Sequence, residues 1–239
     1  MTFLSDFGLK DAYVAQVKAV ILSRVPDAVV IDITHEIPPF GIISAGWLLA
    51  TSFRHFPTGT IHLAVVDPGV GTNRAILALR KEGHVFIGPD NGLFSFLYPS
   101  EEILEITWRP EGPVSATFHG RDTFAPLVVR FLTGHGLGAP GILRKDPVRF
   151  ETSLPMVAHI DVFGNVITNI GCDRLGEGTA MTVNSCVIRK ICNSFSEIPE
   201  GDMGLICGSA GTIEIAANRA RASDMIGAQV GMAVSINPS

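Results

Sequence analysis

The feature that most constrains the fold is a regular alternation of apolar runs of strand length with longer segments of helical periodicity, up to about residue 150. The segments are, in order, a strand at 2–4, a helix at 11–24, a strand at 29–33, a helix at 42–56, a strand at 60–66, strands at 75–80 and 84–87, and a helix at 123–132. Strands that alternate with helices pack as a mostly parallel sheet with helices on both faces. We therefore expect an α/β N-terminal domain with a mostly parallel sheet.

The pattern changes after the polar stretch at 145–155. Short strands separated by turn residues are predicted at 157–162, 166–170, 180–183, 187–191, 205–207, 212–216 and 229–236. This pattern is typical of a small all-β domain. We expect two domains, an α/β domain at 1–150 and an all-β domain at 151–239.

Composition excludes several classes of protein. The net charge is −5 and the basic residues are scattered, which argues against a nucleic-acid partner. No apolar run reaches the roughly 18 residues of a membrane-spanning helix, so no membrane association is expected. The first residues, Met1 to Asp6, contain no basic region, which is unlike a signal peptide. A cytoplasmic location is expected.

The four cysteines, Cys172, Cys186, Cys192 and Cys207, form no CxxC pair. A zinc site is therefore not expected. In a cytoplasmic protein, buried free thiols are the ordinary state of such residues. We expect all four to be free.

Three polar side chains lie at the ends of apolar segments or in the loops beside them, where they are not needed for a packed core. Asp67 ends the apolar run 61–66, Arg74 lies in the loop that follows, and His119 lies in a glycine-flanked turn before an apolar helix. Such an acid, arginine and histidine can orient a water molecule or a polarised substrate. The alternative is a structural ion pair between Asp67 and Arg74 with an unrelated histidine at the surface. Spacing alone leaves both interpretations open.

The same region allows a metal site as a third interpretation. Asp67, His119 and Asp122, with His62, are side chains that bind hard or borderline cations. The nearby guanidinium groups of Arg74 and of Arg121 would repel a cation, so a site without metal is favoured.

Further candidate binding residues lie near strand ends and turns. Asp6 follows the first strand, where a carboxylate can accept hydrogen bonds from ribose hydroxyls or can simply shape the turn before Gly8. In the second domain, Phe163 offers a stacking face and Asn165 a donor and acceptor for a base edge, although Gly164-Asn165 is also a good hairpin turn.

Two polar residues of the second domain complete the candidates. Ser209, in a Gly-Ser-Ala-Gly segment, can bind a carboxylate or belong to a turn. Glu214 lies in an alternating strand, where it can contact a ligand or face solvent.

Taken together and in order, these segments resemble one family. The motifs that carry the resemblance are Ser-Asp-Phe-Gly at 5–8, Val-Val-Asp-Pro-Gly-Val-Gly at 65–71 with Arg74, Gly-Pro-Asp-Asn-Gly at 88–92, His-Gly-Arg-Asp at 119–122, Phe-Gly-Asn at 163–165 with Thr-Asn-Ile at 168–170, and Asn-Arg-Ala at 218–220. The chain resembles, over nearly its whole length, the S-adenosyl-L-methionine (SAM) hydroxide adenosyltransferases, or SAM hydrolases. This family is related to the fluorinase and chlorinase enzymes.

The resemblance implies an α/β domain followed by a barrel-like β domain. It also implies a homotrimer in which each active site lies between the N-terminal domain of one subunit and the C-terminal domain of its neighbour. The implied reaction converts SAM and water to adenosine and L-methionine, with SAM as the substrate and no cofactor or metal.

The family's water-orienting trio would fall on Asp67, Arg74 and His119. Its substrate contacts would fall on Asp6 for the ribose, Asp161 for the methionine ammonium, Phe163 and Asn165 for the adenine, Ser209 for the methionine carboxylate, and Glu214 as a weaker assignment. Family members often carry a second serine where this chain has Ala210.

Two alternative functions remain open. A SAM- or adenosine-binding module would need no catalytic trio. A SAM-dependent halogenase is disfavoured, because the halogenases carry a tyrosine in place of Asp67 and the fluorinase has a serine in place of Gly120 and a long insertion that this chain lacks.

Overall fold

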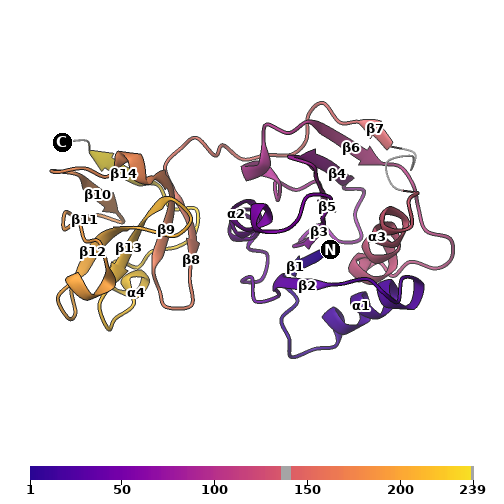
Figure 1. Ribbon diagram of the computed structural model, residues 1–239, viewed down its shortest axis with the longest axis horizontal. Coiled ribbons are helices and arrows are strands. Elements are labelled where there is room, and N and C mark those ends of the chain that lie inside the picture. Colours follow the sequence, from indigo (N-terminus) through magenta and orange to yellow (C-terminus); the bar gives the residue numbers. More distant parts are fainter. Residues whose placement is uncertain (136–140, 238–239) are drawn as a thin grey trace. The chain divides into compact units, whose positions relative to one another are not determined.

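The computed structural model describes residues 1–135 and 141–237. The chain divides into two compact units, residues 1–150 and residues 151–239, which are considered separately (Figure 1). No helix among the described residues is both long enough and apolar enough to cross a bilayer.

A seven-stranded sheet forms the centre of the described part of the first unit. In spatial order its strands are β2 (Ile31–Thr34), β1 (Thr2–Ser5), β3 (Ile61–Val65), β5 (His84–Pro89), β4 (Ile76–Lys81), β6 (Glu102–Ile106) and β7 (Gly141–Leu143). The strands β2, β1, β3 and β5 run parallel, as the alternating pattern predicts. The other pairs, β5 with β4, β4 with β6 and β6 with β7, are antiparallel, so the sheet is mixed.

The change of direction has a local cause. Glu82 and Gly83 both have positive φ, 50° and 75°, between β4 and β5. Two such residues in succession favour a tight hairpin turn, which reverses the chain and makes the pair antiparallel.

Helices cover both faces of this sheet (Figure 1). On one face α1 (Tyr13–Arg24) and α3 (Ala125–Leu132) pack against a core that includes Phe3, Leu63 and Val65. On the other face, α2 (Ile42–Ser52) and the adjoining short helix η1 (Phe53–His55) pack against the alternate residues of the same strands, among them Leu4 and Ala64. Both sides of β1 and β3 are therefore buried, which explains why these strands read as continuous apolar runs. Another short helix, η2 (Ser95–Leu97), contributes Leu97 to the second core.

The helix predicted at 123–132 is preceded by one π-helical turn, η3 (Gly120–Phe124). Such turns are rare and occur often at functional sites. This turn begins directly after His119 and therefore fixes where that side chain leaves the backbone.

The second unit contains two antiparallel sheets. One has the order β11 (Cys186–Ile188), β10 (Ala180–Val183), β14 (Val234–Asn237), and the other has the order β12 (Met203–Cys207), β13 (Thr212–Ala217), β9 (Val166–Gly171), β8 (Val157–Ile160). Residues from both sheets, including Val166, Met181, Ile215 and Val234, share one apolar core. Three short helices, η4 (Cys172–Arg174), η5 (Phe195–Glu197) and α4 (Ala222–Ile226), lie in the connections.

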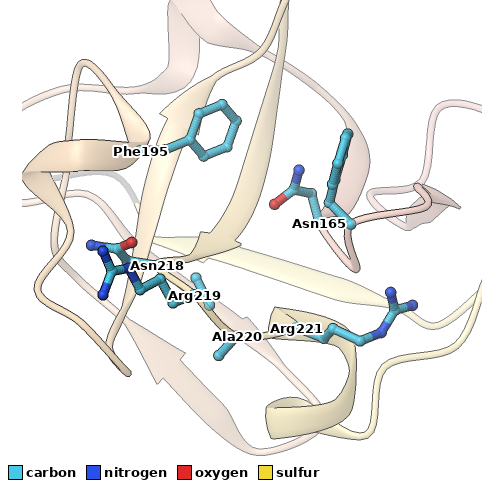
Figure 2. A pocket seen from close by; sticks show the side chains of 8 residues that line it. Asn165, Phe195, Asn218, Arg219, Ala220 and Arg221 are labelled. Carbon is cyan, nitrogen blue, oxygen red and sulfur yellow. The ribbon is translucent and has the colours of Figure 1, made fainter.

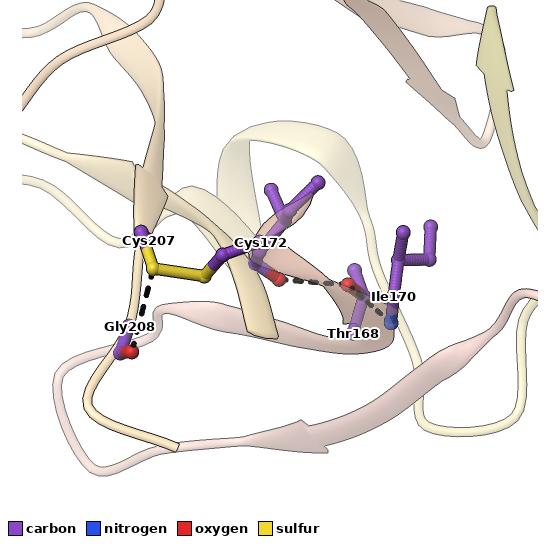
Figure 3. Close-up of a disulfide and its surroundings, with 6 residues drawn as sticks. Thr168, Ile170, Cys172, Cys207 and Gly208 are labelled. Atoms are coloured by element: carbon purple, nitrogen blue, oxygen red, sulfur yellow. Dashed lines mark hydrogen bonds between the residues drawn. A yellow bond between two sulfur atoms is a disulfide. The ribbon is translucent and has the colours of Figure 1, made fainter. Parts of the chain in front are cut away.

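The prediction of four free thiols is wrong for two of the cysteines. Cys172, which follows β9, and Cys207, which ends β12, form a disulfide with a Cα–Cα distance of 5.5 Å (Figure 3). The two segments are brought together by the sheet, because the backbone N–H of Cys172 donates to the carbonyl oxygen of Gly211 in the β12–β13 turn. Cys186 and Cys192 are free.

Candidate active site

Asp67, Arg74 and His119 meet at the carboxyl edge of the parallel strands. Arg74 Nε lies 2.7 Å from Asp67 Oδ1 and 2.8 Å from Oδ2, and Arg74 Nη2 also donates to Oδ2. The same Nη2 lies 3.1 Å from Nδ1 of His119. The side chains of Arg74 and Asp67 are only 10% and 5% exposed. The guanidinium is thus held by both partners and is shielded from solvent, so His119 is not an unrelated surface residue.

The tautomer of His119 follows from its contact with Arg74. A guanidinium can only donate, so Nδ1 must be the acceptor and a neutral ring carries its proton on Nε2. Burial lowers the pKa of His119, and the charge of Arg74 lowers it further, although Asp67 and Asp122 oppose both effects. His119 is therefore neutral at neutral pH, with an N–H available for a second partner.

Asp6 lies beside this trio. It follows β1, which is the neighbour of β3 in the sheet, and its Oδ2 accepts the backbone N–H of Phe40 at 2.9 Å. Burial raises the pKa of Asp6, and the nearby charge of Asp67 raises it further. The two carboxylates therefore face the same space.

That space is a cavity of about 160 Å³. Its lining contains Asp6, Asp67 and His119 together with the aromatic residues Phe7, Phe40 and Phe118. Gly120 forms part of the same wall, and a β-carbon there would lie 3.1 Å from the ring of Phe7. The cavity is small, mostly apolar and negatively charged at one side, which suits a cationic ligand and one ordered water.

In the second unit, one carboxylate organises the turn between β8 and β9. Asp161 Oδ1 accepts the backbone N–H groups of Phe163 and Asn165, and Oδ2 accepts the side-chain N–H of Asn165 at 2.8 Å. The turn interpretation of this segment is therefore correct, yet it also leaves Phe163 73% exposed and Asn165 7% exposed. Because the amide nitrogen of Asn165 is held by Asp161, its oxygen remains as an acceptor.

Phe163 and Asn165 line a cavity of about 510 Å³, a size typical of small-molecule sites. Figure 2 shows Asn165 and Phe195 on opposite sides of it, above the segment from Asn218 to Arg221. Phe195 is not among the residues predicted from the sequence, because it lies on η5 in a polar stretch with no periodicity. Two aromatic faces and an amide are a suitable set for a flat heterocycle.

Ser209 and Glu214 lie near each other in the hairpin of β12 and β13. Ser209 is exposed in the turn, and within the described residues its hydroxyl has no partner. Glu214 is 9% exposed on β13, and a β-carbon at Gly208 would overlap its carboxylate, so the carboxylate lies against the turn. Burial raises the pKa of Glu214, and the charge of Asp161 raises it further. The expectation that Glu214 can face solvent is wrong, and its burial beside Asp161 favours a cationic partner.

Of the four residues considered for a metal site, Asp67 and His119 both contact Arg74, whereas the other two have separate partners. His62 lies inside the core, where it contacts Thr2 and His84. Asp122 forms two hydrogen bonds with Arg121 and accepts the backbone N–H of Ser115. Within residues 1–135 and 141–237, no group of three histidine, cysteine or carboxylate side chains has the geometry of a metal site.

Comparison with known proteins identifies the relatives of this chain. Residues 1–141 match the model of the SAM hydroxide adenosyltransferase N-terminal domain, and residues 156–235 match that of the C-terminal domain. The (R)-S-adenosyl-L-methionine hydrolase of Thermus thermophilus is 38% identical over 98% of both chains. A fluorinase of Nocardia brasiliensis is 30% identical over 74% of both chains. The crystal structure of an uncharacterised conserved protein from Thermotoga maritima superposes with a TM-score of 0.90 at 34% identity, over 99% of both chains. By both of its domains, this chain belongs to the SAM hydroxide adenosyltransferase family.

Proposed function

We propose that this protein is an enzyme that hydrolyses SAM to adenosine and L-methionine. A water attacks C5′ in line with the departing sulfur, the C5′–S bond breaks, and the proton of the water goes to the protein. The observation that carries this proposal is the buried Asp67–Arg74–His119 trio at the edge of a small cavity, in a chain whose similar curated relatives are named as SAM hydrolases.

Asp67 is the group that we assign as proton acceptor. A carboxylate offers about four lone-pair positions, and Arg74 occupies three of them, two on Oδ2 and one on Oδ1. One position on Oδ1 therefore remains for the water. His119 cannot accept at Nδ1, which faces Arg74, so it donates from Nε2 and orients the water.

The remaining candidate residues divide the substrate between them. Asp6 binds the ribose hydroxyls, and Phe163 and Asn165 bind the adenine together with Phe195 of the same cavity. Asp161 and Glu214 face the methionine ammonium, and Ser209 binds its carboxylate. Glu214 is buried, and among the described residues its carboxylate has no hydrogen-bond or ion-pair partner. This supports the placement, because a cation there would compensate the cost of its burial.

A halide nucleophile is disfavoured by the charge of the cavity. Asp6 and Asp67 lie close enough for the charge of Asp67 to raise the pKa of Asp6. An anion that enters between two carboxylates meets repulsion from both, whereas neutral water does not. The reaction needs no acid at sulfur, because a sulfonium leaves as a neutral thioether, and we propose no metal or cofactor.

We propose a homotrimer in which each site takes its Asp6 side from one subunit and its Asn165 side from a neighbour. Subunit mixing tests this arrangement. Asp6→Ala and Asn165→Ala are each expected to be inactive alone and to recover activity when exchanged into mixed trimers. No recovery, with exchange verified by mass spectrometry, would contradict it. We further propose that the second unit closes as a barrel, supported by the isolated bridges Met156–Ala233 and Ile191–Leu205 between its sheets.

The experiment that tests the reaction is incubation with SAM in water enriched in oxygen-18. Adenosine and methionine are expected in equal amounts, with the heavy oxygen at the 5′ position of adenosine, because water attacks carbon C5′. Calorimetric binding of SAM without product after long incubation would instead indicate a binding module. Loss of activity with a chelator, restored by zinc or magnesium, would revive a metal-dependent hydrolase.

A further inference from the structure

A second cavity adjoins the trio, and Asp6 is not part of its lining. It has a volume of about 460 Å³, and Arg74 and His119 are among the residues that line it. His119 also lines the smaller cavity that contains Asp6 and Asp67, so the two cavities share this residue. The function proposed above makes no use of this second cavity.

The charge of the second cavity is positive. Its lining contains the guanidinium groups of Arg74 and Arg109 and no carboxylate. The charge of Arg74 is compensated by Asp67, but within the described residues Arg109 has only backbone partners, since its Nη1 donates to the carbonyl oxygens of Ile106 and Trp108. Nε and Nη2 of this exposed side chain therefore keep their N–H donors, and no carboxylate in the described ranges forms an ion pair with it.

Neutral hydrogen-bonding groups lie in the same wall. Thr123, only 4% exposed, and Asn73 both line the cavity, and in the described part of the chain neither side chain has a hydrogen-bond partner. Both side chains can therefore donate a hydrogen bond to a ligand or a water in the cavity. The lining also contains three apolar residues, Ile76, Pro110 and Val114.

We propose that this cavity is a binding site for a phosphate-type oxyanion, either free or at the end of a small organic molecule. The planar fork of an arginine matches such oxygens, and hydroxyl and amide donors complete their coordination. The cavity is larger than inorganic phosphate requires, and its apolar part gives room for a short carbon chain. The site shares Arg74 and His119 with the proposed SAM site, but it differs in its other residues and in the sign of its charge.

The test measures binding of inorganic phosphate and of glycerol 3-phosphate to the full chain by isothermal titration calorimetry, at constant ionic strength. Saturable binding of at least one of them is expected. Arg109→Gln is expected to weaken it at least tenfold, and Thr123→Val, which keeps the shape of the side chain but removes the hydroxyl, is expected to weaken it several-fold. Tighter binding of glycerol 3-phosphate would identify a phosphomonoester as the preferred form.

Arg24→Gln is the matched control. Arg24 lines a separate cavity beside Trp108 and Arg130, so this substitution removes the same charge from the neighbouring surface. It is expected to leave the affinity unchanged. Absence of saturable binding, or equal losses in Arg24→Gln and Arg109→Gln, would overturn the proposal. The measurement needs no turnover, so a chain that hydrolyses SAM without binding phosphate contradicts this inference alone.

Discussion

Replacement of Asp67 by asparagine is the sharpest perturbation of the proposed chemistry. Asparagine has the same shape, but its amide has one oxygen instead of two and its nitrogen would point N–H groups at the N–H groups of Arg74. It can neither accept the proton of the water nor keep all three contacts with the guanidinium. General-base assistance is worth about 10²–10⁴-fold, so kcat is expected to fall by that factor, equivalent to about 2.7–5.5 kcal/mol in the activation free energy.

The assay is the rate of adenosine formation at saturating SAM, followed by chromatography, with SAM affinity measured separately by calorimetry. Affinity is expected to change little, because Asp67 acts on the water. Asp11→Asn, which removes one charge from an exposed position of the same unit, is expected to keep full activity. If Asp67→Asn keeps its kcat and only weakens SAM binding, Asp67 is not the proton acceptor.

Three further results are expected. The kcat should decline as pH falls, with a midpoint below the ordinary histidine pKa of 6.5, because the pKa of His119 is lowered and protonation at Nδ1 would place a second cation against Arg74. The variant His119→Asn should lose this decline at low pH, and an unchanged decline would exclude His119 as its cause. Glu214→Gln should raise the KM for SAM with little effect on kcat, since a charge-assisted hydrogen bond worth about 1.5–3 kcal/mol is lost, and an unchanged KM would exclude contact with the ammonium. Cys172→Ser should lower the free energy of unfolding by about 3–4 kcal/mol, the value for a closed loop of 35 residues. Urea denaturation measures this change, with Cys186→Ser as the control, and equal stability of the Cys172→Ser variant and the unchanged protein would show that the disulfide contributes nothing.

The parts of this protein that could be predicted from the sequence are those encoded by local periodicity. The helix at Ile42–Ser52 and the buried strand at Ile61–Val65 follow from apolar runs bounded by turn residues. The candidate residues Asp67 and Arg74 also follow from sequence, since each lies at a strand end or in the loop after it. In these cases each segment is determined by its own residues.

What could not be predicted depends on contacts between distant segments. Arg74 and His119 are 45 positions apart, and only the packing of β3, β4 and η3 brings them within hydrogen-bonding distance. The disulfide joins two segments that carry no common pattern, and Phe195 enters its cavity from a loop with no periodic signal. The strands β6 and β7 lie outside the predicted strands for the same reason, because their pairings with β4 and with each other are tertiary contacts.

The close approach of Phe7 and Phe118 to Gly120 limits how this pocket can be redesigned. A β-carbon at position 120 would lie 3.1 Å from one ring and 3.3 Å from the other, so even alanine requires an aromatic side chain to move. Both rings also pack edge-on against Tyr13, which restricts that movement. A change of the side chain at position 120, by design or in evolution, is therefore expected to be tolerated best together with a smaller residue at position 7 or 118.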